Sequence, residues 1–140
     1  MNILNLPFTK KIGIEKTLNK EFLLELPFLE NNENHIRTLH GSAIFSFAEI
    51  TSGYFLRQNF EDIASQTVPI LRNADIKFKK PVSEKVYSKA KFINTNRKLI
   101  MDELSHKNKI LFDIEVKIYS EAKILVATGI YEWFVRLNLN

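Results

Sequence analysis

Residues 41–58 are the feature that most restricts the fold of this chain, because they have the length and residue types of one long buried helix. At about 100° per residue, one helical face carries mostly large apolar side chains: Ile44, Phe47, Ala48, Thr51 and Phe55. The opposite face carries Ser42, Ser46, Glu49 and Gly53. Glu49 is the only carboxylate of this stretch. Because desolvation disfavours a charged carboxylate, Glu49 is expected either to face water or to serve a function.

Most of the remaining sequence alternates apolar and polar residues with period two, which predicts strands over residues 20–29, 66–82, 86–93, 110–119 and 123–137. The alternation breaks at Arg72, so we predict a bulge near residues 70–72. Two shorter helices are predicted over residues 8–19 and 97–105. Thr95 or Asn96 would cap the second of these, which would bury Leu99, Ile100 and Leu104. One long helix cannot cover both faces of such a sheet, so the order predicts an α+β fold with an antiparallel sheet wrapped around it.

Length and composition limit the classes of protein to consider. The 140 residues suit a single domain, residues 1–140, and 45% hydrophobic with 26% charged residues is ordinary for a globular protein. The absence of cysteine excludes a disulfide scaffold, a thiolate metal site and a cysteine nucleophile. Neither a signal peptide nor an apolar run of about 20 residues is present, which predicts a cytoplasmic protein without a membrane span.

The charge pattern does not favour nucleic acid. A net charge of +4 and a pI near 9.3 suit either an anionic partner or a mildly basic surface. The lysines are spread along the chain, and no zinc-finger or RNA-binding motif occurs. The three histidines lack metal-ligand spacing, so no metal and no cofactor is predicted.

The run from Asn34 to Glu49 carries a recognisable spacing: an Asn, then a His-Gly pair at residues 40 and 41, then an acid nine residues after the His. Phe78, separated from Pro81 by two residues, and the terminal residues 125–129 extend the pattern. In these features the chain resembles hotdog-fold acyl-CoA thioesterases of the phenylacetic-acid-pathway (PaaI-like) family. The resemblance covers roughly residues 20–135, and it implies the hotdog fold, in which a sheet wraps a central helix.

The sequence departs from the family pattern at three positions. Ser42 replaces the second Gly that follows the His, and Arg37 stands where a Gly usually precedes it by three residues. Leu71 falls where some members of the family use a Ser or Thr of the partner subunit, and Asn73 and Thr67 are the polar residues nearby.

The resemblance implies hydrolysis of an acyl-CoA thioester to a free acid and CoA. Glu49 would be the general base or nucleophile, and the Gly41 N–H would donate to the oxyanion. Asn34 would orient the water or the thioester, and His40 would hold the loop or polarise the carbonyl. Substrate contacts are expected from Ser42, Asn73, Phe45, Arg97 and Lys98. The family places its sites between subunits, which implies a homodimer or a homotetramer built as a dimer of dimers.

Two alternatives remain open from the sequence. Ser42 and Leu71 favour a non-catalytic hotdog protein that binds acyl-CoA or lipid. A hotdog dehydratase also pairs a His with an acid, but the Pro-Gly-rich context expected around that pair is missing.

Overall fold

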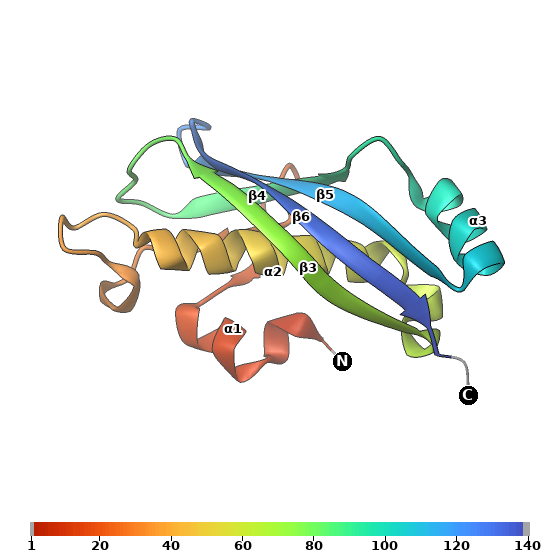
Figure 1. Ribbon diagram of the computed structural model, residues 1–140. Coiled ribbons are helices and arrows are strands. Elements are labelled where there is room, and N and C mark those ends of the chain that lie inside the picture. The colour runs from red at the N-terminus through yellow and green to blue at the C-terminus, as the bar shows by residue number, and fades with distance from the viewer. Residues whose placement is uncertain (1, 139–140) are drawn as a thin grey trace.

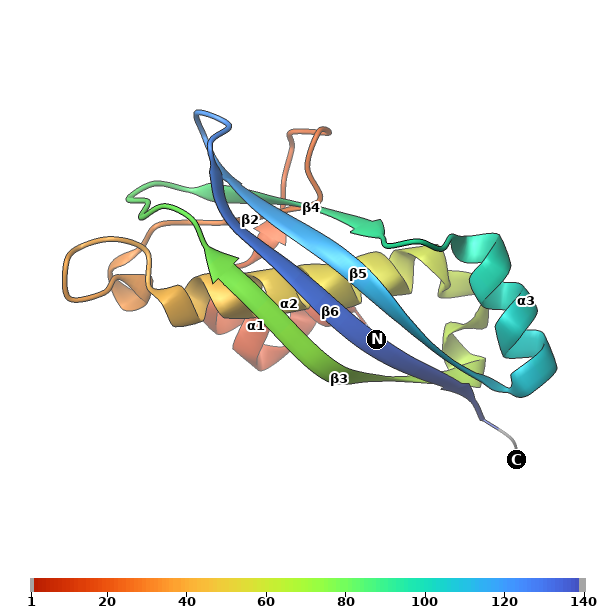
Figure 2. The same cartoon turned by 45° about the horizontal axis from the view of Figure 1, so that its top comes forward.

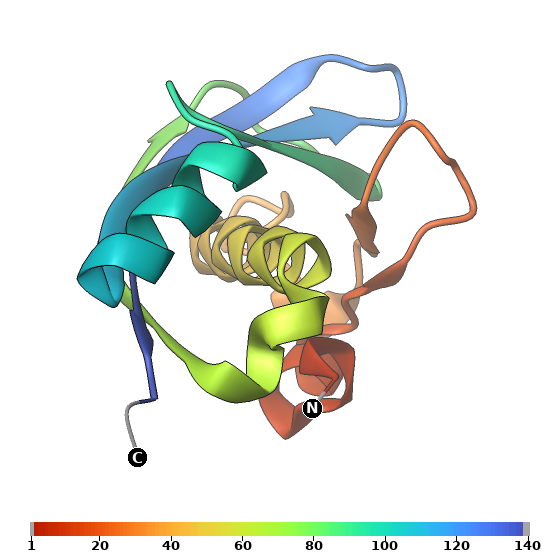
Figure 3. The same cartoon turned by 90° about the vertical axis from the view of Figure 1, so that its right-hand side faces the viewer.

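The computed structural model describes residues 2–138, and its centre is helix α2, Gly41–Asn59, as predicted. A six-stranded antiparallel sheet curves over one side of α2, while helix α1, Pro7–Ile12, lies on the other (Figure 1). In the view along α2, the sheet and the N-terminal segment together surround the helix (Figure 3). The predicted α+β sheet wrapped around one helix is therefore confirmed.

The order of strands in the sheet is β1-β2-β4-β5-β6-β3. The strands comprise β1, Glu15–Lys16; β2, Leu24–Leu26; β3, Thr67–Phe78; β4, Val86–Phe92; β5, Lys109–Ser120; and β6, Leu125–Leu137. Strand β6 lies between β5 and β3. Its residues alternate between a buried inner face, which includes Tyr131 and Trp133, and an outer face on which Ile130 is exposed. Strand β3 is long but pairs only with β6, so one of its two edges is unpaired (Figure 2).

The predicted bulge is confirmed in β3, where the register shifts between Leu71 and Asn73. Before the shift, Ile70 pairs with Phe134; after it, Ala74 pairs with Tyr131. Because paired residues of neighbouring strands point to the same face, the extra residue Arg72 turns Leu71 and Ala74 toward the helix and leaves Ile70 on the outer face.

Helix α2 packs most of its circumference into the core. Ile44, Phe47, Ala48 and Thr51 are buried as predicted, and the Thr51 hydroxyl donates to Ser88 of β4 at 2.9 Å. The opposite stripe is not simply solvated. Gly53 is buried against Trp133 of β6, so small residues there allow close packing.

Several short elements differ from the predictions. Helix α1 ends at Ile12 rather than near residue 19, because Gly13 adopts a left-handed conformation with φ of 85° and closes the helix. Strand β2 is much shorter than residues 20–29, because the Asn19 side chain and carbonyl accept from the N–H groups of Glu21 and Phe22 and form a turn. The structure also contains three 3₁₀ segments: η1, Ile3–Asn5; η2, Glu30–Asn32; and η3, Glu61–Gln66.

Helix α3, Arg97–Lys107, is capped by Asn96, whose side chain accepts from the Leu99 N–H. Ile100 and Leu104 are buried, but the prediction for Leu99 was wrong, since its side chain is 53% exposed. Leu99 lies on the solvent side of α3, whose only buried residues are the other two. Within residues 2–138, no helix is both long and apolar enough to cross a membrane.

Candidate active site

The N-terminus of α2 presents one free backbone donor. The ring Nδ1 of His40 accepts from the Ser42 N–H at 3.0 Å and so caps the helix. Within residues 2–138, the Gly41 N–H has no hydrogen-bond partner. First-turn N–H groups carry the positive end of the helix dipole, so this free donor favours an oxygen with developing negative charge.

The loop before α2 is closed by Asn34. Its Oδ1 accepts from the N–H groups of Ile36 and Thr38, and its Nδ2 donates to the Thr38 hydroxyl at 2.7 Å. Both polar atoms of the Asn34 side chain thus bind within the loop itself. Arg37 has φ of 60°, a left-handed backbone conformation that favours Gly. The residue is unusual at this position, but the backbone keeps the conformation a Gly would adopt.

Glu49 is half-buried in the middle of α2. Its carboxylate forms no hydrogen bond or ion pair within residues 2–138, and burial raises its pKa above the ordinary range of a carboxyl. A carboxylate that is partly desolvated and unpaired is a stronger proton acceptor than one in water. Glu49 therefore has the electrostatic character of a general base.

Tyr131 of β6 lies opposite Glu49. The Trp133 Nε1–H donates to the Ser52 hydroxyl at 3.1 Å and fixes the alignment of the two elements. In Figure 1, α2 and β6 run in the same direction. Glu49 precedes Ser52 by about 4.5 Å of helix, and Tyr131 precedes Trp133 by about 7 Å of strand. The two side chains consequently occupy similar levels along the helix.

The Tyr131 hydroxyl is the one buried side-chain polar atom without a partner in the described part of the chain. The residue has no exposed surface, and its pKa is raised by burial and by the charge of Glu49. Gly129 makes room for it: a Cβ there would lie 2.7 Å from Tyr131 Cε2 and 2.9 Å from its hydroxyl. The sequence analysis missed Tyr131. A glycine inside a predicted strand was the available signal, because it often marks such a close approach.

The other predicted site residues are dispersed. Ser42 is exposed in the first turn of α2, and Phe45 is partly exposed one turn later. Asn73 is exposed on the edge strand β3, opposite Glu132. Lys98, at the start of α3, is exposed. It lies near the far end of α2, which is about 27 Å along the helix from Gly41.

Arg97 is already engaged by the protein. Its guanidinium donates to the Asp62 carboxylate and to the Asn59 carbonyl, both at 2.7 Å. These contacts join the end of α2 to the start of α3. Among the described residues, no cluster of three or more His, Asp or Glu side chains could hold a metal ion.

A long helix wrapped by a curved antiparallel sheet, with an acid at mid-helix and a free N–H at its start, defines a protein of the hotdog fold. The chain belongs to the DUF4442 family, a domain of unknown function whose model matches residues 3–135. No curated protein matches the sequence.

Solved structures confirm the fold. A Pseudomonas aeruginosa protein of unknown function, described as a probable thioesterase, is 20% identical with a TM-score of 0.83, over 97% of this chain and 91% of its own. A Bacillus halodurans protein crystallised with CoA is 18% identical with a TM-score of 0.70, over 91% of this chain and 74% of its own. A mutant form of the phenylacetic acid degradation protein PaaI from Thermus thermophilus is 15% identical with a TM-score of 0.68, over 92% of this chain and 98% of its own.

Proposed function

We propose that this protein is a thioester hydrolase that converts acyl-CoA to a free acid and CoA. The observation that carries the proposal is the half-buried, unpaired Glu49, whose pKa is raised by burial, as suits a general base. The free Gly41 N–H at the positive end of the same helix adds a donor for an oxyanion. The structural similarity to a probable thioesterase and to a CoA-bound protein supports the choice of substrate.

The site requires two subunits. Gly41 and Glu49 lie eight residues apart on one helix, which is about 12 Å along its axis. The Gly41 N–H points out of the helix, away from Glu49, so a carbonyl bound to it lies further still. One reacting carbonyl cannot be within hydrogen-bond reach of both groups of one chain. We therefore pair Glu49 of one subunit with Gly41 of the partner subunit.

The edge strand β3 supplies the surface for such a dimer. Its outer edge is unpaired, and the inward-facing Leu71, Ala74 and Ile76 are only half-buried because no element beyond β3 covers them. A second copy whose β3 pairs with this edge would continue the sheet and cover these side chains. An apolar row across the outer face, Ile70, Phe134 and Leu111, offers a second contact for a dimer of dimers.

In the proposed reaction, the oxygen of a water molecule attacks the thioester carbon while Glu49 accepts the water proton. The carbonyl oxygen becomes an oxyanion that accepts from the N–H of Gly41 of the partner subunit. When the tetrahedral intermediate collapses, the carbon–sulfur bond breaks and the CoA sulfur takes the proton from Glu49. Direct attack by Glu49, with water then cleaving the acyl-enzyme anhydride, remains the other route.

Supporting residues hold this geometry. We assign His40 the role of positioning Gly41 by capping the helix, and Asn34 that of closing the loop. Lys98 is the freer cation for the phosphates of CoA, since Arg97 already binds Asp62. Ser42, Phe45 and Asn73 are exposed near the proposed interface and stay as candidate substrate contacts.

Mixing two inactive variants tests both the chemistry and the pairing of subunits. G41P deletes the proposed N–H donor, and the first position of a helix tolerates Pro. The preceding His40 already has the extended backbone (φ −63°, ψ 134°) that a following Pro requires. G41A, which keeps the N–H, is the matched control. E49Q removes the base.

We expect G41P and E49Q each to lose at least a hundredfold in kcat on an acyl-CoA panel, whereas G41A retains turnover. Refolding the two inactive variants together should restore about a quarter of wild-type activity, because half of the dimers are mixed and each has one intact site. Full activity of E49Q would refute the proposed function. Inactive variants that never complement would refute the shared site.

A non-catalytic acyl-CoA-binding protein is the second candidate function. Leu71 cannot hydrogen-bond through its side chain, and the polar atoms of Asn34 are used within its loop. Calorimetric binding of acyl-CoA by the wild-type protein without release of CoA would favour this candidate.

A further inference from the structure

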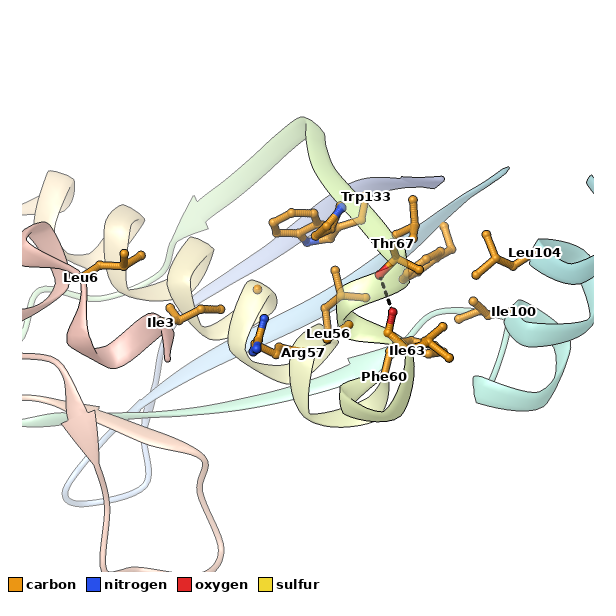
Figure 4. Close-up of a pocket in the computed structure, with 15 residues that line it drawn as sticks. Ile3, Leu6, Leu56, Arg57, Phe60, Ile63, Thr67, Ile100, Leu104 and Trp133 are labelled. Carbon is orange, nitrogen blue, oxygen red and sulfur yellow. Dashed lines mark hydrogen bonds between the residues drawn. The ribbon is translucent and has the colours of Figure 1, made fainter. Parts of the chain in front are cut away.

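The C-terminal half of α2 borders an apolar cavity of about 380 Å³. Its walls come from the N-terminal segment around η1, from α2, η3 and α3, from the start of β3, from β5 and from the end of β6 (Figure 4). Ile3 closes one side, Ile100 and Leu104 of α3 close another, and Trp133 lies across the top in this view. A cavity of this size and lining is typical of a site that encloses a small apolar ligand.

The cavity begins next to the proposed catalytic site. Gly53, one helical turn after Glu49, lines the cavity and packs against the Trp133 ring, whose nearest carbon would lie 3.5 Å from a Cβ at this position. The Ser52 hydroxyl holds the Trp133 ring in place at this position. Because Glu49 and Gly53 lie one turn apart on the same face of α2, a chain attached to a carbonyl at Glu49 would follow this face to reach the cavity.

The lining contains almost no hydrogen-bonding groups. Thr67 donates its hydroxyl to the Ile63 carbonyl at 3.2 Å, as Figure 4 shows, so it is already satisfied. Arg57 is the only charged residue of the lining, and within residues 2–138 its guanidinium has no ion-pair or hydrogen-bond partner. A hydroxyl group deep inside, away from Arg57, would lose its hydration without replacement, so this part of the cavity selects against polar chains.

The length of the path along α2 limits the length of the acyl chain that the cavity can hold. From Glu49 to Phe60, which lines the far end, α2 rises by about 16 Å. Carbon–carbon bonds of about 1.5 Å at tetrahedral angles advance an extended alkyl chain by about 1.3 Å per carbon. The available path thus accommodates about eight to twelve carbons.

We propose that this cavity binds the unbranched aliphatic acyl chain of the substrate, with medium-chain acyl-CoA as the preferred class. The proposal rests on the proposed thioesterase function for the reaction at Glu49, but binding in the cavity can be measured without turnover. Each methylene that enters the cavity should raise kcat/KM about fourfold until the chain fills it.

Trp133 is the single tryptophan of the sequence, so its fluorescence reports on the cavity alone. Bromine quenches indole fluorescence on contact. We expect a brominated decanoyl-CoA to quench Trp133 in E49Q, which would bind the thioester without cleaving it. In a second experiment, brominated decanoate is added to the wild-type protein and quenching of Trp133 is measured. Comparison of the two experiments distinguishes a free fatty acid from a thioester as the natural source of the chain. Absence of quenching in both experiments overturns the proposal.

A substitution in the lining tests the chain-length limit. A64F places a ring in the cavity, while S65F adds the same ring at an exposed neighbour outside it. We expect A64F to lower the ratio of kcat/KM for decanoyl-CoA to that for butyryl-CoA at least tenfold and to weaken quenching, whereas S65F keeps the wild-type ratio. If A64F fails to fold, the smaller A64L serves the same test.

The outcomes separate the two hypotheses. Quenching without hydrolysis of any thioester retains the cavity as an acyl site and refutes the proposed function. Hydrolysis with no dependence on chain length, or with an unchanged ratio in A64F, retains the function and overturns the assignment of the cavity.

Discussion

Replacing Tyr131 with Phe should make the protein more stable, although the residue is completely buried. The hydroxyl has no hydrogen-bond partner in the described part of the chain, so folding removes it from water without compensation. A buried polar group left unpaired costs about 1–3 kcal/mol. Removing one oxygen also loses a few dispersion contacts, each about 0.1–0.2 kcal/mol. We therefore expect Y131F to gain about 1 kcal/mol in the free energy of unfolding.

For a chain of 140 residues, an unfolding entropy of about 2.1 cal/mol/K per residue converts this gain into a rise in Tm of about 3 °C. Urea denaturation followed by circular dichroism would measure the free energy, and a thermal scan would measure Tm. Y54F is the matched control, because the Tyr54 hydroxyl accepts from the Gln58 amide at 2.8 Å. The same chemical change should cost Y54F about 0.5–1.5 kcal/mol.

Activity distinguishes a functional hydroxyl from an accidental one. If the Tyr131 hydroxyl binds the attacking water or the Glu49 carboxylate during turnover, the more stable Y131F should lose at least tenfold in kcat on a medium-chain acyl-CoA. A hydroxyl that serves no function leaves kcat unchanged. A loss of stability greater than about 1 kcal/mol in Y131F would refute the reasoning, since it would show that the hydroxyl has a partner in the folded protein.

Four further outcomes are expected. Because burial raises the pKa of Glu49, ionisation of this side chain opposes folding. E49Q should therefore match the wild-type free energy of unfolding at acid pH and exceed it as the pH rises through the pKa of Glu49. Urea titrations across pH would measure this difference. For the same reason, the apparent pKa of the acid limb in the pH profile of kcat/KM should lie above the ordinary range of a carboxyl. H40A should lose about 0.5–2 kcal/mol of stability through the missing cap, and H40N should recover most of it. G129A should lose about 1–3 kcal/mol, because its Cβ would overlap the Tyr131 ring, and a double variant with Y131L should lose less than the sum of the single changes.

The long helix and the long strands of this fold could be predicted from the sequence. Helix α2 and strands β3, β5 and β6 are each longer than ten residues, and their apolar periods repeat often enough to identify helix or strand. The break at Arg72 even located the bulge in β3. Short elements were predicted less well, because one local contact decides them: the Asn19 turn shortened β2, and Gly13 ended α1.

The surroundings of Glu49 could not be predicted from the sequence, for a different reason. The hydrogen bond from Trp133 to Ser52 joins residues 81 positions apart, and no local period reports such a contact. That bond aligns β6 with α2 and so places Tyr131 opposite Glu49. Helical phasing alone grouped Glu49 with small residues and left open whether they faced solvent or protein.

The spacing from Gly41 to Glu49 is informative because it is too long for one site. On a helix, eight residues separate the two groups by about 12 Å, so the pattern is compatible with thioester chemistry only where two helices meet. The unpaired edge of β3 and its half-buried Leu71 and Ala74 supply an independent reason for two chains to associate. If they associate there, the same contact that covers the edge of the sheet also completes the site. Activity and dimerisation should then be lost together when a Pro in β3 blocks the outer edge, while the folded monomer keeps its α2 core.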